Sequence, residues 1–179
     1  MRTRSLFVIL LLGVALLTLA LVVRSGWFEV RNNDEPINTA MRASLAQERP
    51  ELSTQDSLTI DRLYPTALKK HSGLRIVVRA PGTGTATPQP GDQVTVHYAG
   101  RLLDGSPIDS SYVGGAPFSF QVGTGQVIKG WDEAILTMKK GEKRTLIIPY
   151  WLGYGVQGRP PTIPAKATLV FEVELLNFK

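Results

Sequence analysis

Three regions follow one another along the chain, and each has its own pattern of hydrophobic and polar residues. Residues 6–23 form an unbroken apolar run in which Thr18 is the only polar side chain. Residues 31–70 are polar, mixed in charge and interrupted by prolines. From Leu74 onward, apolar and polar residues alternate with period two, which is typical of strands. We therefore expect a transmembrane segment (residues 1–26), a polar linker (residues 27–71) and a folded domain (residues 72–179).

The apolar run has the length of a membrane-spanning helix. Its 18 residues reach about 27 Å as an α-helix, which just spans the hydrocarbon core of a bilayer. The alternative is a cleaved signal peptide, because Arg2 and Arg4 precede the run, but no clear small-residue cleavage site ends it. We expect an uncleaved signal-anchor with Trp27 and Phe28 at the membrane interface. The chain would then be a single-pass protein of a cell inner membrane, with its C-terminal domain in the periplasm or otherwise outside the cytoplasm.

The linker carries two segments, residues 39–47 and 55–63, that are compatible with short helices. Ser53 or Thr54 would cap the second of them. We interpret the linker as a spacer that holds the C-terminal domain off the membrane. The alternative is a dimerisation segment, and the sequence leaves the oligomeric state open.

The C-terminal domain has the pattern of several strands and one helix. Alternation predicts strands at residues 74–79, 93–103, 118–122, 143–149 and 167–178. Trp131, Ile135 and Met138 recur at helical spacing, which predicts a short helix over residues 131–139 with Gly141 at its C-terminal cap. The domain therefore belongs to the α+β class.

Aromatic residues from distant segments converge in this arrangement. Tyr98 and Phe171 lie on the inward faces of two predicted strands, and Trp131 begins the helix that should cover the sheet. Patterning alone leaves two interpretations open: these residues line a pocket, or they are ordinary core.

Composition excludes several classes of function. The chain has no cysteine, so it has no disulfide and no thiolate metal site. The net charge of +5 is spread along the chain and forms no basic stripe, which argues against nucleic-acid binding. His71 and His97 are the only histidines, and Ser110 and Ser111 lack the context of a nucleophilic serine. We expect neither a metal nor a cofactor.

Seven short motifs are informative when their order and spacing are considered together. They are Val94–Gly100 (VTVHYAG), Asp104–Gly105, Asp109–Ser111, Pro117–Phe120, Gln126–Trp131 (QVIKGW), Gly153–Gly155 and Ala167–Leu175. In this order and spacing, the chain over about residues 72–179 resembles the FKBP family of peptidyl-prolyl cis-trans isomerases. The resemblance implies a curled antiparallel sheet of five to six strands around one short α-helix. It also implies rotamase activity in protein folding, with proline-containing polypeptides as clients.

The resemblance further implies which residues form the proline-binding pocket. They are Tyr98, Asp109, Phe118, Val127, Ile128, Trp131, Tyr154, Ile163 and Phe171. Trp131 would form the floor, and three other aromatic residues would form the walls. The Ile128 backbone N–H and the Tyr154 hydroxyl would bind the peptide, and Asp109 would lie beside the carbonyl that precedes proline.

Three positions depart from the family pattern. Ile108 stands where the family has a pocket phenylalanine, and Gly114 stands where an arginine often pairs with the pocket aspartate. Arg159, followed by two prolines, occupies a flap position often held by histidine. We expect these departures to alter substrate preference and to weaken the binding of macrolide inhibitors, without abolishing activity.

A second function remains compatible with the same pocket. A membrane-tethered module that binds proline-containing peptides as a chaperone or assembly factor, with little catalysis, would look alike in sequence. The retention of the pocket aromatics favours the enzyme.

Overall fold

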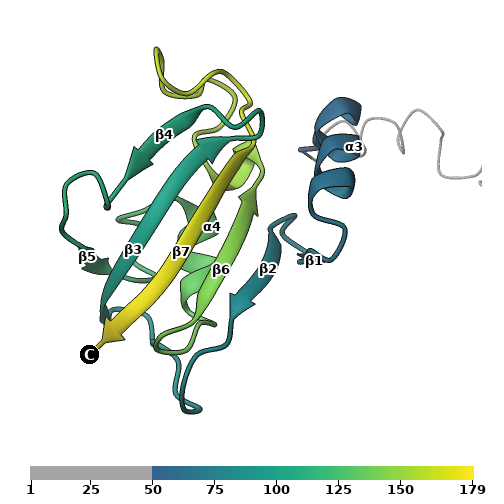
Figure 1. Ribbon diagram of the computed structural model, residues 1–179. Helices are drawn as coiled ribbons and strands as arrows, with labels where there is room; N and C mark the ends of the chain where they lie inside the picture. The colour runs from purple at the N-terminus through teal and green to yellow at the C-terminus, as the bar shows by residue number, and fades with distance from the viewer. Residues whose placement is uncertain (1–49) are drawn as a thin grey trace, which may run out of the picture. The chain divides into compact units, whose positions relative to one another are not determined.

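The computed structural model describes residues 50–179, which form one compact unit beginning at Pro50 (Figure 1). Its elements are α3 (Thr54–Leu63), β1 (Leu68–Lys69), β2 (Arg75–Ala80), β3 (Gln93–Leu102), β4 (Pro107–Ser110), β5 (Phe118–Gln121), α4 (Lys129–Ile135), β6 (Lys143–Ile148), the 3₁₀ helix η1 (Tyr150–Leu152) and β7 (Leu169–Phe178). The predicted transmembrane segment and the helix predicted at residues 39–47 lie outside the described residues. Between Pro50 and Lys179, no helix is long and apolar enough to cross a membrane.

All seven strands join one antiparallel sheet in the order β1-β2-β6-β7-β3-β4, and β5 also pairs with β3. The ten-residue strand β3 pairs with two strands along the same edge. Strand β5 pairs with its residues 93–96 and β4 with its residues 99–101. A turn at Asp104–Gly105 connects β3 to β4, with Gly105 at φ 95° and its N–H bonded to the Leu102 carbonyl. This edge of the sheet brings the ends of β4 and β5 close to the centre of β3.

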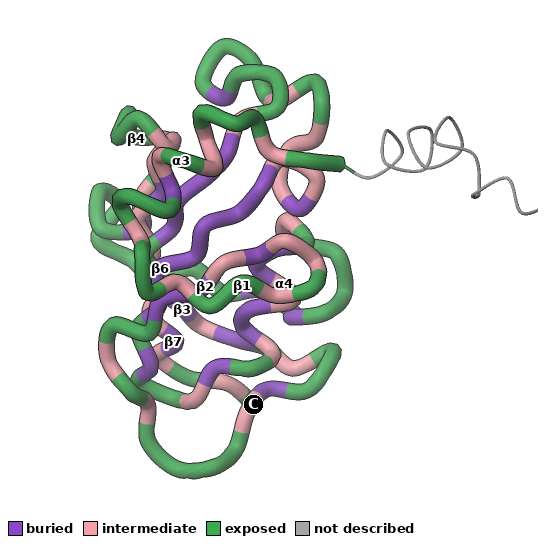
Figure 2. The backbone as a smooth tube through the Cα atoms, turned by 90° about the vertical axis from the view of Figure 1, so that its right-hand side faces the viewer, coloured by how far each residue is buried: buried purple, intermediate pink, exposed green. Residues whose placement is uncertain are grey.

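One face of the sheet holds the main core. Alternate strand residues are fully buried there, among them Val94, Val96, Leu146, Leu169 and Leu175, as the period-two pattern predicts. Helix α4 lies behind the sheet in Figure 1 and packs against this face. In Figure 2 the buried stretches (purple) run through the strands and the exposed stretches (green) through the loops. The sheet and its single short helix therefore enclose one apolar interior.

The opposite face of the sheet is covered in part by α3. Ile60, the buried residue of that helix, packs with Val77, Ile147 and Val170, whose side chains point away from the main core. Tyr64, which follows α3, accepts a hydrogen bond through its hydroxyl from the Arg101 guanidinium at 3.1 Å. Helix α3 is thus part of the folded unit.

Polar contacts fix α3 at both ends. The Ser53 hydroxyl caps the helix by accepting a hydrogen bond from the Asp56 N–H at 2.9 Å, as predicted for one of two candidate caps. Asp56 in turn accepts a hydrogen bond from the Thr168 hydroxyl at 2.5 Å, next to β7. Asp61 pairs with the Arg75 guanidinium of β2. These contacts tie the start and the end of the helix to two different strands.

The structure therefore differs from the expected spacer at residues 50–71. We drew the boundary of the domain at residue 72, whereas the compact unit begins at Pro50 and includes both α3 and β1. The physical reason is the apolar side chain of Ile60, which is 0% exposed and closes the second face of the sheet.

Three smaller differences concern element boundaries. The sheet has seven strands, because the two-residue β1 and the short β4 add to those predicted. Asp109 and Ser110 belong to strand β4, where they pair with Gly100 and Ala99 of β3. Helix α4 begins at Lys129 and ends at Ile135, so the predicted last turn and the predicted cap at Gly141 lie beyond it. Met138 nevertheless is fully buried in the core.

Candidate active site

An aromatic pit forms where α4 faces the concave side of the sheet. Trp131 is 4% exposed, and its ring centre lies 5.0 Å from that of Tyr98 and 5.3 Å from that of Phe171, both at nearly perpendicular angles. Phe118 of β5 closes a third side, with its ring centre 6.4 Å from that of Trp131. Edge-to-face contacts of this kind hold large rings firmly in place. Trp131 thus lies at the bottom of an apolar pit whose sides are formed by Tyr98, Phe118 and Phe171.

Local sequence determines how Trp131 reaches the floor. Gly130 lets the start of α4 approach β6, since a Cβ at this position would lie 2.7 Å from a methyl carbon of Ile148. The Asp132 carboxylate accepts hydrogen bonds from the Gly123 N–H at 2.8 Å and the Gly125 N–H at 3.0 Å. Asp132 therefore holds the loop before α4 against the helix, and this loop forms the next wall of the pocket.

Phe171 lies against a glycine of the neighbouring strand. A Cβ at Gly100 would lie 2.3 Å from the Phe171 ring, so only glycine leaves room for the ring in this orientation. Phe171 is 5% exposed and sits on the inward face of β7, as predicted. The absence of one side chain in β3 therefore creates the space for one wall of the pit.

A short hydrogen bond connects β3 to β4 at the rim of the pit. The Tyr98 hydroxyl donates to Asp109 Oδ2 at 2.6 Å, and Asp109 Oδ1 accepts from the Ser110 N–H at 2.8 Å. Burial, followed by the hydrogen bond to Asp109 and the charges of Asp109 and Tyr154, raises the pKa of Tyr98 to about 12. Tyr98 therefore stays protonated at neutral pH and fixes the orientation of the Asp109 carboxylate.

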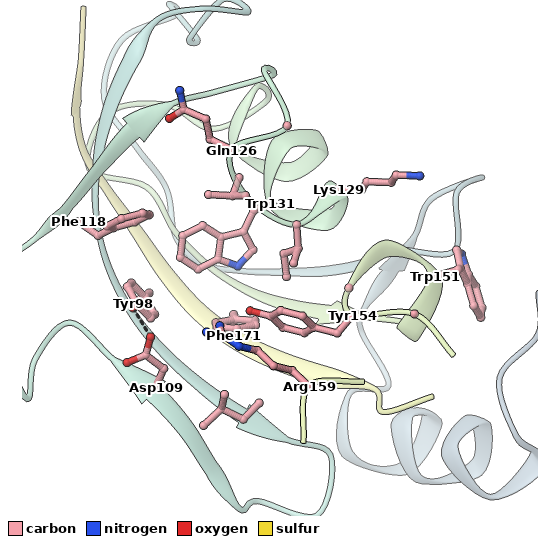
Figure 3. Close-up of a pocket in the computed structure, with 16 residues that line it drawn as sticks. Tyr98, Asp109, Phe118, Gln126, Lys129, Trp131, Trp151, Tyr154, Arg159 and Phe171 are labelled. Carbon is pink, nitrogen blue, oxygen red and sulfur yellow. Dashed lines mark hydrogen bonds between the residues drawn. The ribbon is translucent and has the colours of Figure 1, made fainter. Parts of the chain in front are cut away.

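Two polar groups at the rim are available to a ligand. Ile128 is the N-terminal cap of α4 in an extended conformation, and its N–H makes no hydrogen bond with residues 50–179. The Tyr154 hydroxyl likewise has no hydrogen-bond partner in this part of the chain, and Figure 3 shows the Tyr154 side chain beside Phe171. An apolar pit with a backbone donor and a hydroxyl at its rim can hold a ring and bind the carbonyl groups on either side of it.

The whole pocket has a volume of about 910 Å³ (Figure 3). The structure places all the predicted site residues around it except Ile163. Ile163 is 2% exposed and belongs to the core, where its backbone N–H and carbonyl pair with those of Arg159. Its side chain packs among apolar neighbours, so it supports the pocket from behind. The catalytic roles that we assigned by resemblance stay predictions.

Several lining residues were not predicted. They are Gly125, Gln126, Lys129, Trp151, Gly153 and Gly155. Trp151 is held by a hydrogen bond from its indole N–H to the Ser72 carbonyl at 2.8 Å, and its ring covers Gly73. No motif connects these two segments, so only the folded chain could place Trp151 here.

The three departures from the family pattern have clear structural consequences. Ile108 lines the pocket beside Asp109. Gly114 lies in an exposed loop with no atom within 4 Å of the space that a Cβ would occupy, and it does not line the pocket. Arg159 lines the pocket from the loop between η1 and β7. Among residues 50–179, Asp109 has no ion-pair partner, in agreement with the missing arginine at position 114.

Comparison with known proteins identifies this kind of site. A profile of the family described as FKBP-type peptidyl-prolyl cis-trans isomerase matches residues 84–176, just over half of the chain. The chain belongs to this family. FK506-binding protein 1A from Aspergillus fumigatus is 53% identical over 105 residues, which are 59% of this chain and 94% of the relative. Peptidyl-prolyl cis-trans isomerase FKBP2 from Mus musculus is 58% identical over 89 residues, 50% of this chain and 64% of the relative. Peptidyl-prolyl cis-trans isomerase FKBP4 from Mus musculus is 51% identical over 111 residues, 62% of this chain and 24% of the relative.

The family model covers residues 84–176, and we call the compact unit that contains them, residues 50–179, the FKBP-type domain. The chain spans nearly all of the fungal relative but less than two thirds of the two mouse relatives. Family and relatives agree on the activity, so the FKBP-type domain is a peptidyl-prolyl cis-trans isomerase.

Proposed function

We propose that the FKBP-type domain isomerises X-Pro bonds of polypeptides outside the cytoplasm, and that the apolar run at residues 6–23 holds it at a membrane. The observation that carries the catalytic part is the apolar pit of Tyr98, Phe118, Trp131 and Phe171. At its rim, the Ile128 N–H and the Tyr154 hydroxyl have no hydrogen-bond partner among residues 50–179. Proline-containing segments of client proteins are the substrates. Macrolides that occupy the same pit are inhibitors, with binding weakened by the absence of a ring at Ile108.

The chemistry requires no nucleophile and no proton transfer. Resonance across the amide gives a rotational barrier of about 18–20 kcal/mol, so X-Pro bonds interconvert in tens to hundreds of seconds. In the twisted transition state this resonance is lost, and the carbonyl becomes less polar. An apolar pit that excludes water therefore favours the twisted state over the planar, strongly solvated amide. A rate gain of about 10⁴ requires roughly 5.5 kcal/mol of such differential stabilisation.

Each rim group has a definite part in this proposal. The proline ring lies on Trp131, and the Ile128 N–H donates a hydrogen bond to the carbonyl of the proline residue. The Tyr154 hydroxyl donates to the carbonyl that precedes proline, on the side of the pocket where Asp109 lies. These contacts hold both flanking carbonyls while the bond between them rotates.

The membrane part of the proposal rests on the sequence of the N-terminal region. Residues 6–23 contain no charged side chain, and Arg2 and Arg4 precede them on the side that we assign to the cytoplasm. In this arrangement the FKBP-type domain acts on proteins that fold in the periplasm, close to the inner membrane.

A protease-free assay of short X-Pro peptides tests the catalytic part. We expect the full chain in detergent to accelerate cis-to-trans conversion, and Phe171→Ala and Tyr154→Ala to lose most of this acceleration. Circular dichroism and thermal unfolding show whether each variant is folded. Leu58→Ala is the matched control, since Leu58 is 62% exposed on α3 and lies outside the pocket.

The assay separates the two functions that the sequence left open. Acceleration that disappears in folded pocket variants supports catalysis in the pit. A folded wild-type chain that binds proline-containing peptides without accelerating any of them would instead establish a chaperone or assembly module.

A further inference from the structure

The formal charges in the pocket are few and unevenly placed. Of the sixteen lining residues, only Asp109, Lys129 and Arg159 are charged. The segment from residue 110 to residue 128, part of which lines the pocket, has no charged side chain. A substrate therefore meets one acidic and two basic groups at the rim of an otherwise neutral pocket.

The acidic group and the basic groups differ in whether they already make hydrogen bonds within the domain. Both oxygens of Asp109 accept hydrogen bonds, from Tyr98 and from the Ser110 N–H. The guanidinium of Arg159 makes no hydrogen bond and no ion pair with any residue between Pro50 and Lys179. Arg159 therefore presents its five N–H donors to whatever enters the pocket.

The backbone holds Arg159 at a defined place beside the pit. Its N–H and carbonyl pair with the carbonyl and N–H of Ile163 at 2.8 Å and 3.0 Å, and Ile163 is buried in the core. Gly158 precedes it at φ 68°, where a Cβ would lie 2.2 Å from the Pro164 carbonyl oxygen. Figure 3 shows the Arg159 side chain reaching toward Phe171, whereas the Lys129 side chain points away from Trp131. Arg159 is thus the basic residue that stands next to the pit.

We propose that Arg159 is a specificity-determining residue that favours substrates with an acidic residue directly before proline. This inference rests on the proposed function, which places Asp109 and Tyr154 beside the carbonyl preceding proline. Arg159 belongs to the same loop as Tyr154, so its guanidinium faces the side chain of that preceding residue. A glutamate there gains a charge-assisted hydrogen bond that a glutamine of equal size cannot match.

The size of the preference follows from two opposing effects. Arg159 is exposed, and exposed ion pairs contribute about 0.2–1 kcal/mol, which is a factor of up to about five in kcat/KM. The charge of Asp109 acts against an acidic side chain and reduces this gain. We therefore expect peptides with Glu before proline to have about two- to threefold higher kcat/KM than those with Gln, with most of the difference lost in about 1 M salt.

The experiment uses the full chain in detergent and a peptide series with Leu, Gln, Glu or Lys directly before proline. We expect Arg159→Gln to bring the Glu-to-Gln ratio of kcat/KM close to one. Arg159→Lys should restore part of the ratio, because it restores the charge. Lys69→Gln is the matched control, since Lys69 is exposed on β1 and lies outside the pocket.

The outcomes distinguish this inference from the function on which it rests. No acceleration of the Leu and Gln peptides would overturn the proposed function itself. Acceleration of these peptides together with equal rates for Glu and Gln would overturn the role of Arg159 alone. A preference for Glu that survives in Arg159→Gln, or that also disappears in Lys69→Gln, would likewise overturn it.

Discussion

At the scale of single residues, Gly100 shows how one missing side chain shapes the pit. We predict that Gly100→Ala forces the Phe171 ring out of its position, since the new Cβ would lie 2.3 Å from it. Overpacking of this kind costs about 1–3 kcal/mol of the free energy of unfolding. We expect kcat/KM for X-Pro peptides to fall about tenfold or more, because the ring also forms a wall of the pit. Urea unfolding and the peptide assay measure the two effects.

A second glycine provides the control for this change. Gly114 has no atom within 4 Å of its Cβ position and does not line the pocket. Gly114→Ala should therefore leave stability within about 0.5 kcal/mol of wild type. If Gly100→Ala were as stable and as active as Gly114→Ala, the assignment of Phe171 to a tightly packed wall would be wrong.

The raised pKa of Tyr98 leads to a prediction about stability at alkaline pH. Its pKa rises from 10.0 to about 12 on folding, so between these values the folded chain keeps a proton that the unfolded chain has lost. The number of bound protons is then lower in the unfolded state, and the free energy of unfolding falls as pH rises through this range. The stabilising contribution of the Tyr98 hydroxyl is fully present below about pH 10. It should be lost progressively as the pH approaches 12.

Comparison with Tyr98→Phe isolates this contribution from the other groups that titrate at alkaline pH. We expect the difference in unfolding free energy between wild type and variant to shrink from about pH 9.5 to pH 11.5, measured by urea unfolding. A difference that stayed constant across this range would show that the hydroxyl has an ordinary pKa in the folded protein.

At the scale of elements, α3 contributes stability to the sheet without entering the pit. We predict that Ile60→Ala lowers the free energy of unfolding by about 2–5 kcal/mol, because it removes the buried residue that α3 places on Val77, Ile147 and Val170. The rate constant per folded molecule should be unchanged, since the aromatic pit lies on the opposite face of the sheet. Denaturant unfolding and the peptide assay on the same preparation test both statements.

The exposed face of the same helix provides the comparison. Leu58 is 62% exposed, so Leu58→Ala should change stability by no more than about 0.5 kcal/mol. Equal destabilisation by the two substitutions would indicate that α3 is stabilised by its own propensity and not by packing. Loss of activity in folded Ile60→Ala would contradict the separation of the two faces.

The position of α3 also shows what the sequence could and could not predict about the fold. The helix and its Ser53 cap follow from local signals, and the strands from period-two alternation. The docking of α3 depends on one buried residue, Ile60. A single apolar residue does not produce the apolar stripe by which a packed helix is recognised in a sequence. The sequence signal for this docking was in the sheet. Ile147 and Val170 are apolar at strand positions where the alternation would place polar residues, and they form the face that α3 covers.

The site could be predicted to the extent that its residues lie in regular elements. Tyr98, Phe171 and Trp131 occupy strand and helix positions whose direction follows from periodicity, and they meet in the structure as expected. Trp151 depends on a hydrogen bond to Ser72, 79 positions away in the sequence, which no local pattern reveals. The sequence therefore could not place a residue such as Trp151, whose position depends on a contact far away along the chain.

At the scale of the whole molecule, the two faces of the sheet pack against different helices. The face toward α4 forms the pit, and the face toward α3 receives the segment that leads back to the N-terminal region. The described unit begins at Pro50, just before this helix.

The last prediction concerns the apolar run at residues 6–23. Expressed in a bacterial host, the full chain should remain in the membrane fraction after alkaline carbonate extraction, and protease added to spheroplasts should degrade the FKBP-type domain. A chain that begins at Trp27 behind a cleavable export signal should leave the membrane fraction with its kcat/KM unchanged. Intact mass measurement decides between the two interpretations of the run. A mature protein that lacks the first 20 to 26 residues and appears in the periplasmic extract would establish a cleaved signal peptide, and the membrane part of the proposal would then be wrong.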